Sequence, residues 1–285
     1  MRILILGGDG MLGHAFFTHF CAHAPTHDVR VTLHRNLEAY NSFGVFSAAT
    51  TFAGVDARST DRLIEVLAEF RPEVVINAIG IVKQRNAAKE SLPCIELNAL
   101  LPHRLAVLCK GVGARLVQLS TDCIFSGKQG NYQESDPSDA EDLYGKTKFL
   151  GEVHENHCLT LRTSSVGPEL GSSKGLLAWF LAQRSSVKGF RNAIYTGLTS
   201  PELARVVADL LVNHPDASGL YQLAGDPINK YDLLHLFKAR FHREIDILPD
   251  ETFHCDRSLD SSRFRREFGY VPPTWETMVK NLPDL

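Results

Sequence analysis

Short apolar runs alternate with stretches of helical period over roughly the first 165 residues. The first run, residues 2–6, is almost wholly apolar and is followed by glycines, which is typical of a strand covered on both faces. Similar runs lie at residues 29–33, 50–55, 73–80, 114–120 and 158–164. Helical periodicity marks the segments between and after them, at 11–23, 59–70, 90–111 and 144–153. Repeated strand-helix units predict an α/β fold with a doubly wound parallel sheet of the Rossmann type.

The pattern changes after the strand predicted at residues 158–164. Glycines and serines crowd residues 165–175, and the later elements are shorter. Beyond them we predict helices at 200–213 and 229–241 and a strand at 219–225. We therefore expect a dinucleotide-binding domain at residues 1–165. Residues 166–285 are expected to form a smaller, mixed substrate-binding lobe, some of whose elements rejoin the core.

Composition narrows the classes of partner. The 285 residues carry 30 Lys and Arg against 33 Asp and Glu, so no strong net charge recruits nucleic acid or an anionic membrane. The six cysteines lack C-x-x-C spacing, and the twelve histidines show no metal spacing, which argues against a metal site and a disulfide framework. The opening apolar run is too short for a signal peptide, and no long apolar stretch is evident, so a soluble, cytoplasmic protein is expected. A homodimer is left open.

A glycine motif joins the first predicted strand to the first predicted helix. Gly7, Gly10 and Gly13 have the spacing G-x-x-G-x-x-G. Such glycines permit a tight turn, close approach of the backbone to a pyrophosphate, and close packing of helix on strand. The helix N-terminus at Met11 and Leu12 would add N–H groups and the positive end of its dipole. The strand before the motif and the helix after it favour dinucleotide binding over a flexible turn.

The ends of the next strands predict the rest of the cofactor site. His34 and Arg35 follow the second strand where an acid would favour NAD, so they indicate NADPH, with NADH possible and a plain surface arginine as the alternative. Asp56, after the third strand, could accept a hydrogen bond from the adenine amino group or cap the helix beginning near Thr60. The residues after the fourth strand should line the middle of the cofactor: Asn77, Ala78 and Gly80.

Three polar residues form a candidate catalytic group. Thr121 ends the fifth strand, and Tyr144 and Lys148 are four residues apart on a predicted helix, so they share one face. A phenol with a pKa of about 10 exchanges protons slowly at neutral pH, and a neighbouring cation would lower that pKa. We expect Thr121 to position a carbonyl, Tyr144 to donate its proton, and Lys148 also to hold the nicotinamide ribose. The alternative is a pair of ordinary surface neighbours on the helix.

The segments "GGDGMLG", "VVINAIG", "STDCIFSG" and "YGKTKFLGE" resemble, in order and spacing, those of the extended short-chain dehydrogenase/reductases. Within them the chain is similar to the dTDP-4-dehydrorhamnose reductase family and its nucleotide-sugar relatives, as "DRSLDSSRFRREFGYVPPTW" also indicates. The resemblance implies that Thr121, Tyr144 and Lys148 are catalytic and that the substrate is a nucleotide-linked 4-keto-6-deoxy sugar. Related dehydratases have an acid where Cys123 stands, so a reductase is favoured. "NAIGIVKQ" and "LNALLPHRLA" are closer to reductases of UDP-linked N-acetylamino sugars for surface polysaccharides.

Other side chains are candidates for substrate binding. Lys83 could reach the sugar or be a solvated loop lysine. Arg257 could hold a phosphate or pair with Asp256 or Asp260. Cys123 is interpreted as a small filler beside the substrate rather than a nucleophile. Two other functions stay open: a nucleotide-sugar epimerase with tightly bound NAD, and a non-catalytic, cofactor-binding regulatory subunit.

Overall fold

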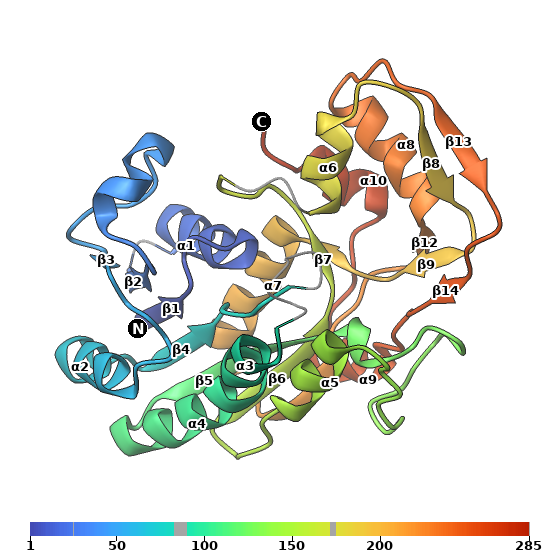
Figure 1. Ribbon diagram of the computed structural model, residues 1–285. Helices are drawn as coiled ribbons and strands as arrows, with labels where there is room; N and C mark the ends of the chain where they lie inside the picture. Colours follow the sequence, from blue (N-terminus) through green and yellow to red (C-terminus); the bar gives the residue numbers. More distant parts are fainter. Residues whose placement is uncertain (25, 83–89, 172–174, 285) are drawn as a thin grey trace.

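A seven-stranded sheet forms the centre of the computed structural model, which describes residues 1–24, 26–82, 90–171 and 175–284 (Figure 1). Its strands lie in the order β11-β6-β5-β4-β1-β2-β3, and every neighbouring pair is parallel. The strands are β1 (Arg2–Leu6), β2 (Asp28–Thr32), β3 (Thr51–Phe52), β4 (Val74–Asn77), β5 (Arg115–Thr121), β6 (Cys158–Thr163) and β11 (Gly219–Gln222). This order reverses at β1, as in a doubly wound sheet, and confirms the predicted Rossmann fold.

Helices bury both faces of this sheet. Successive residues of β1 point to opposite faces, so Ile3 joins a core cluster with Phe16 of α1 (Met11–His23) and with α7 (Ser200–Asn213). Leu4 joins a second cluster with side chains of α2 (Thr60–Phe70) and α4 (Leu101–Val112). Because both faces are covered, the strands must be apolar at nearly every position, which explains the continuous apolar runs.

The helix predicted at residues 90–111 is present, but its hydrogen bonding changes midway. It runs through α3 (Ser91–Cys94), a π-helical turn η3 (Ile95–Leu100) and α4. The π-turn carries the buried Asn98, whose side chain accepts from the Ile81 N–H at 2.8 Å and donates to the Ile81 carbonyl at 3.1 Å. The segment Ser91–Val112 is long and apolar enough to cross a membrane, but the core helices of soluble proteins can have the same length and composition. Leu105 of this segment is fully buried against the sheet.

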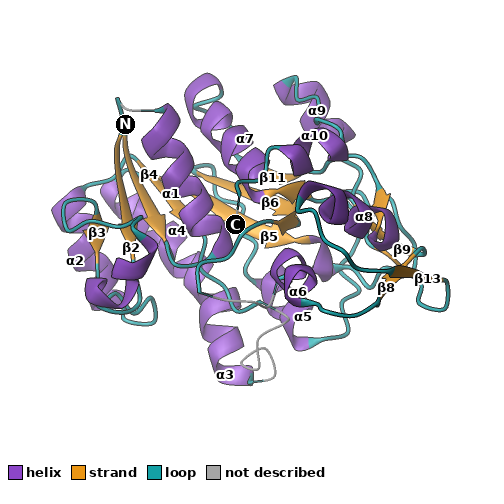
Figure 2. Cartoon of the chain, turned by 90° about the horizontal axis from the view of Figure 1, so that it is seen from above, coloured by secondary structure: helices purple, strands orange, loops and turns teal. Residues whose placement is uncertain are grey.

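Small sheets lie outside the main sheet, and most of their strands are at the end of the molecule opposite β2 and β3 (Figures 1 and 2). They are β7 (Ser165–Val166) with β10 (Leu198–Thr199), β8 (Val187–Phe190) with β13 (Ile247–Asp250), and β9 (Ala193–Tyr195) between β12 (Ile228–Asn229) and β14 (Cys255–Asp256). The remaining helical segments are η1 (Leu37–Phe43), η4 (Asp122–Ile124), α5 (Leu143–Leu150), α6 (Leu176–Ala182), α8 (Lys230–Arg240), α9 (Ser262–Phe268) and α10 (Trp275–Lys280). Both β11, which pairs with β6, and α7 belong to the main layers although they follow residue 165. The boundary at residue 165 stays a prediction.

Candidate active site

The glycine loop between β1 and α1 is built so that its backbone closes on itself. Gly7 has a φ of +81°, and a Cβ on Gly13 would lie 2.0 Å from the Gly7 carbonyl oxygen. The loop is fastened to β2, because the Gly8 N–H donates to the Thr32 carbonyl at 2.9 Å. Any side chain at Gly13 would push the helix away from the strand, so the predicted packing role of this glycine has a direct structural cause.

The start of α1 offers the donors that a pyrophosphate needs. Gly10 is the N-cap residue, and it provides no side-chain cap. The first turn contains Met11, Leu12 and Gly13 and no acidic residue. Its N–H groups and the positive end of the helix dipole therefore face the glycine loop without a competing carboxylate from the helix itself. The cradle fits the phosphates of a dinucleotide.

The region after β2 and β3 surrounds the expected adenosine end. His34 and Arg35 are exposed beyond β2. The Arg35 N–H donates to the Tyr40 hydroxyl at 3.3 Å, and that hydroxyl donates to Asp9 of the glycine loop at 2.9 Å. Tyr40 thus connects the glycine loop to the segment that carries Arg35. The Arg35 guanidinium makes no ion pair with any described residue, which leaves it available to a 2′-phosphate.

Asp56 lies near His34, but both oxygens of its carboxylate already accept hydrogen bonds from the Arg58 guanidinium. Arg58 forms an ion pair with it at 2.7 Å, and this bonding lowers the pKa of Asp56. The alternative role as a helix cap is wrong, because Ser59 caps α2 by accepting from the Arg62 N–H at 3.3 Å. Adenine recognition by Asp56 stays a prediction, and it would share the carboxylate with Arg58.

The residues after β4 lie next to the glycine loop, as the topology requires. A Cβ on Gly7 would come within 2.7 Å of Ile79, so the two loops touch. Asn77 is buried, donates to the Gln118 side chain at 2.8 Å and accepts from the Ile79 N–H at 3.1 Å. Asn77 therefore shapes the loop and presents the backbone that follows it. Ala78 and Gly80, both partly exposed, belong to that backbone.

Thr121 and Tyr144 meet because a glycine lets α5 approach the end of β5. A Cβ on Gly145 would lie 2.3 Å from the Cys123 carbonyl oxygen, so no larger residue fits there. Asp142 caps α5 by accepting from the Gly145 N–H at 2.8 Å. The Thr121 hydroxyl accepts from the Cys123 N–H at 3.1 Å, and Thr121 lies near enough to Tyr144 to act on the pKa of its phenol. The fold therefore brings the predicted threonine and tyrosine next to each other, and their catalytic roles stay a prediction.

The expected lowering of the Tyr144 pKa is wrong for this structure. Burial raises the pKa of Tyr144 above its ordinary value, the nearby Cys123 and Asp122 raise it further, and only the Thr121 hydrogen bond opposes them. Lys148 points elsewhere, because its Nζ donates to the Leu119 carbonyl oxygen at 2.6 Å. Tyr144 is consequently held as a neutral phenol.

Lys148 is buried and is held by the sheet beneath it. Burial lowers the pKa of Lys148 to about 8, and the negative charge of Glu152 opposes that change. Glu152 itself pairs with Arg162 at 2.9 Å and accepts from the Ser120 hydroxyl at 2.6 Å. A buried set of charges thus supports the face of α5 on which Tyr144 and Lys148 lie.

The three predicted substrate ligands have different outcomes. Burial raises the pKa of Cys123 to about 12, which keeps its thiol neutral, in line with a filler. Arg257 donates through Nε to the Phe125 carbonyl oxygen at 2.7 Å. The predicted alternative for Arg257 is wrong, because neither Asp256 nor Asp260 forms an ion pair with it within the described part of the chain. Lys83 lies outside the described residues.

Two site residues escaped the sequence analysis. The Nζ atom of Lys230, the first residue of α8, lies 3.8 Å from the centroid of the Tyr195 ring. Asp122 and Cys123 of the catalytic loop are among the groups that act on the charge of Lys230. Tyr195 ends β9 and Lys230 begins α8, and the two share no sequence motif, so only the fold brings them together.

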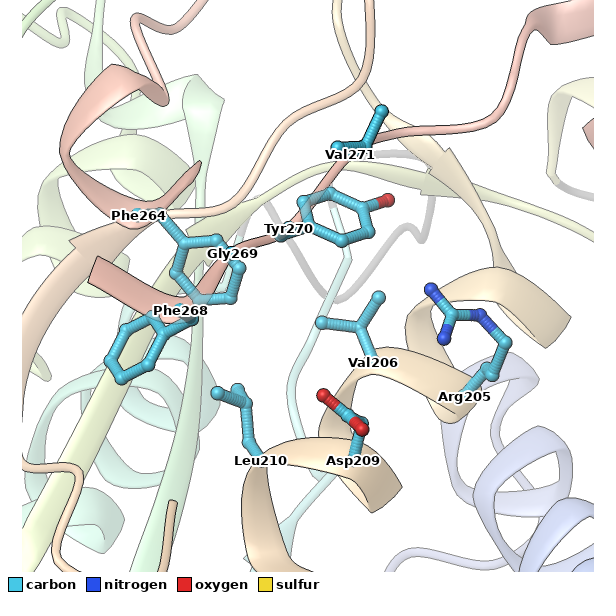
Figure 3. Close-up of a pocket in the computed structure, with 9 residues that line it drawn as sticks. All are labelled: Arg205, Val206, Asp209, Leu210, Phe264, Phe268, Gly269, Tyr270 and Val271. Carbon is cyan, nitrogen blue, oxygen red and sulfur yellow. The ribbon is translucent and has the colours of Figure 1, made fainter. Parts of the chain in front are cut away.

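A separate cavity of about 290 Å³ lies between α7 and α9 (Figure 3). Its lining includes Arg205, Phe268 and Tyr270, and none of the predicted cofactor, catalytic or substrate residues. The Tyr270 hydroxyl donates to Glu202 at 3.1 Å, and Glu202 pairs with Arg205 at 2.8 Å. Because its lining contains none of the predicted site residues, the cavity is separate from the proposed catalytic region. Its polar groups already bond to one another.

The fold, the glycine cradle and the paired threonine and tyrosine define an NAD(P)H-dependent oxidoreductase of the extended short-chain dehydrogenase/reductase type. A family model described as RmlD substrate binding domain matches residues 1–284, and the chain belongs to this family. The dTDP-4-dehydrorhamnose reductase of Salmonella typhimurium is 28% identical over 242 residues, covering 76% of this chain and 81% of that protein. The enzyme of that name from Escherichia coli is 25% identical and covers 99% of this chain and 97% of its own length. The Bacillus anthracis dTDP-4-dehydrorhamnose reductase, solved with NADP, superposes with a TM-score of 0.79 at 20% identity over 99% of this chain and 98% of that one.

Proposed function

We propose that this protein uses NADPH to reduce the C4 ketone of a nucleotide-linked 4-keto-6-deoxy sugar, in the synthesis of surface-polysaccharide precursors. The observation that supports this most directly is the assembly of Thr121 and Tyr144 at the carboxyl edge of the sheet. Lys148 lies on the same helix as Tyr144, and the glycine cradle follows β1, which is separated from β5 by β4 alone. The names of the relatives support the same class of reaction.

Each catalytic side chain has a role that follows from its surroundings. The Thr121 hydroxyl positions the ketone oxygen beside Tyr144. The raised pKa of Tyr144 keeps its phenol protonated, which suits a group that must donate a proton to the oxygen during reduction. Lys148, still largely cationic at neutral pH and held by the Leu119 carbonyl, orients the ribose of the nicotinamide nucleotide rather than acting on Tyr144 directly. The bound cofactor supplies the hydride.

The preference for NADPH rests on the residues after β2. Arg35 is exposed and unpaired among the described residues, and no acid occupies the strand end where a ribose hydroxyl would otherwise be bound. The neighbouring Asp9 carboxylate accepts a hydrogen bond from the Tyr40 hydroxyl. This bond holds the carboxylate toward Tyr40 and partly disperses its negative charge, which lessens its repulsion of a phosphate. NADH has no 2′-phosphate and would therefore lack the proposed contact with Arg35.

The substrate proposal has a first and a second candidate. A dTDP-linked sugar comes first because the relatives carry that name. A UDP-linked N-acetylamino sugar comes second, because the segments "NAIGIVKQ" and "LNALLPHRLA" resemble those of reductases that act on such sugars. In either case Arg257 is proposed to face the diphosphate.

The test is NADPH oxidation, followed by its absorbance, with enzymatically generated dTDP-linked and UDP-linked 4-keto-6-deoxy sugars and with NADH in parallel. We expect rapid oxidation with one nucleotide sugar and slower turnover with NADH. Failure of every sugar to oxidise NADPH would contradict the reductase. Tightly bound NAD that survives purification without net NADPH consumption would indicate an epimerase, and cofactor binding without any turnover would indicate a regulatory subunit.

A further inference from the structure

Two polar side chains beside the catalytic loop lack the partners that buried polar groups normally have. The hydroxyl of Tyr195 is buried and has no hydrogen-bond partner among the described residues. Lys230 lies with its ammonium over the ring of Tyr195, and within the same described part of the chain it donates no hydrogen bond and forms no ion pair. Leaving the buried Tyr195 hydroxyl without a partner costs free energy, and the partly buried Lys230 has no anionic partner in the described structure, so a ligand from outside the chain is expected to meet both.

The register of the three-stranded sheet explains why these groups meet. Asp256 of β14 pairs with Ile194 in a parallel ladder, so the following Arg257 lies beside Tyr195. Asn229 of β12 pairs with the same Ile194 in an antiparallel ladder, so the following Lys230 lies beside Ala193. Side chains of paired residues share a face, and residues two apart along a strand do so as well. Tyr195, Lys230 and Arg257 therefore point to one side of this sheet.

Lys230 is the cation on that side that lacks an acceptor within the described residues. The charged and titratable groups acting on Lys230 are Asp122, Cys123, Cys255 and Arg257. Burial keeps Cys123 as a neutral thiol, and Asp142, which also acts on Arg257, already accepts from the Gly145 N–H. The hydroxyl of Thr121 donates to that carboxylate, Asp122, at 3.1 Å, so part of its capacity is already used. An anionic group would complete the site.

We propose that Lys230, together with the Tyr195 hydroxyl, is a substrate-specificity residue that binds the diphosphate of the nucleotide sugar. This inference rests on the proposed function and names the contact that selects for a nucleotide-linked sugar over a free one. A diphosphate fits because its anionic oxygens can accept from Lys230, Arg257 and the Tyr195 hydroxyl, whereas a neutral sugar hydroxyl would leave Lys230 without an anionic partner. Lys230 is the stronger ligand of the two, because Arg257 already uses its Nε for the Phe125 carbonyl.

The decisive variant is Lys230→Met, which keeps the length and apolar stem of the side chain and removes its charge. We expect binding of dTDP or UDP, measured by calorimetry, to weaken at least about thirtyfold, as for loss of one partner of a buried charge pair. The KM for the nucleotide sugar should rise by a similar factor, while kcat and NADPH affinity stay near wild type. Lys280→Met is the matched control, because Lys280 is exposed at the end of α10 and its ammonium forms no hydrogen bond or ion pair with described residues.

Two further variants separate a binding role from a structural one. Lys230→Arg should restore most nucleoside diphosphate binding because it keeps a cation, and Tyr195→Phe should weaken binding less than Lys230→Met because only a hydroxyl is lost. Unchanged binding of dTDP and UDP in Lys230→Met would overturn the proposal, as would a fall in kcat alone. If Lys230→Met does not fold, Lys230→Gln replaces it under the same criteria. Because dTDP and UDP bind without turnover, this result stands apart from success or failure of the reductase assay.

Discussion

Two lysines, one buried and one partly buried, show how the two sides of the proposed site differ. Lys148, on the proposed cofactor side, donates to the Leu119 carbonyl at 2.6 Å and feels the negative charge of Glu152. Lys230, on the proposed substrate side, lies over an aromatic ring and donates to no described residue. Burial lowers the pKa of each to about 8. One lysine has a partner within the chain, and the other is placed to receive one from a ligand.

The same contrast extends to the neighbouring polar groups. On the cofactor side, Asn77 and Ser120 are buried and fully engaged with Gln118 and Glu152. On the substrate side, the Tyr195 hydroxyl is buried without a partner in the described structure. A preorganised cofactor side can orient the reacting groups, whereas unpaired groups on the substrate side provide binding energy only when the correct ligand arrives.

The largest effect is expected from removing the proton donor. In Tyr144→Phe the ring and its packing stay, and we expect kcat to fall about 10²- to 10⁴-fold because general acid catalysis is lost. NADPH binding, followed by fluorescence titration, should stay unchanged, since the cofactor cradle is formed by the glycine loop. Turnover near the wild-type rate would remove Tyr144 from the role of proton donor. A loss of NADPH binding would instead show that the two sides of the site are not separable in this way.

Sequence reasoning found the cofactor side because its signals are local. Gly7 and Gly13 are six residues apart, in the loop after β1 and in the first turn of α1. Tyr144 and Lys148 are four residues apart on one helix, so spacing along the sequence is enough to predict both pairs. The orientation of Lys148 was not predictable, because the Leu119 carbonyl belongs to a strand far away in sequence. The contact of Tyr195 with Lys230 was not predictable, since the three-residue strand β9 carries no periodic signal and the placement of the start of α8 against it is set by tertiary packing.

The buried charges beneath Lys148 should matter more for stability than an exposed pair elsewhere. Glu152→Gln leaves the Arg162 guanidinium buried without its opposite charge, so we expect the free energy of unfolding to fall by about 3–5 kcal/mol. Urea denaturation measures this value. The matched control is Glu65→Gln, which breaks an exposed helix pair with Arg62 and should cost about 0–1 kcal/mol. Equal losses in the two variants would show that the internal pairing of the cofactor side contributes no special stability.

The smallest effect is a pH dependence that distinguishes the two lysines. Both ammonium groups lose their charge as the pH rises through about 8, the value to which burial lowers each pKa. If Lys230 binds the diphosphate, the KM for the nucleotide sugar should rise above pH 8 by up to about tenfold per pH unit. Lys230→Met should have a high KM that no longer changes over this range, because the titrating group is gone. The alkaline fall in kcat, which depends on Lys148, should persist in the same variant. A KM that rises equally in both proteins would assign the titration to another group and would end the functional distinction between the two lysines.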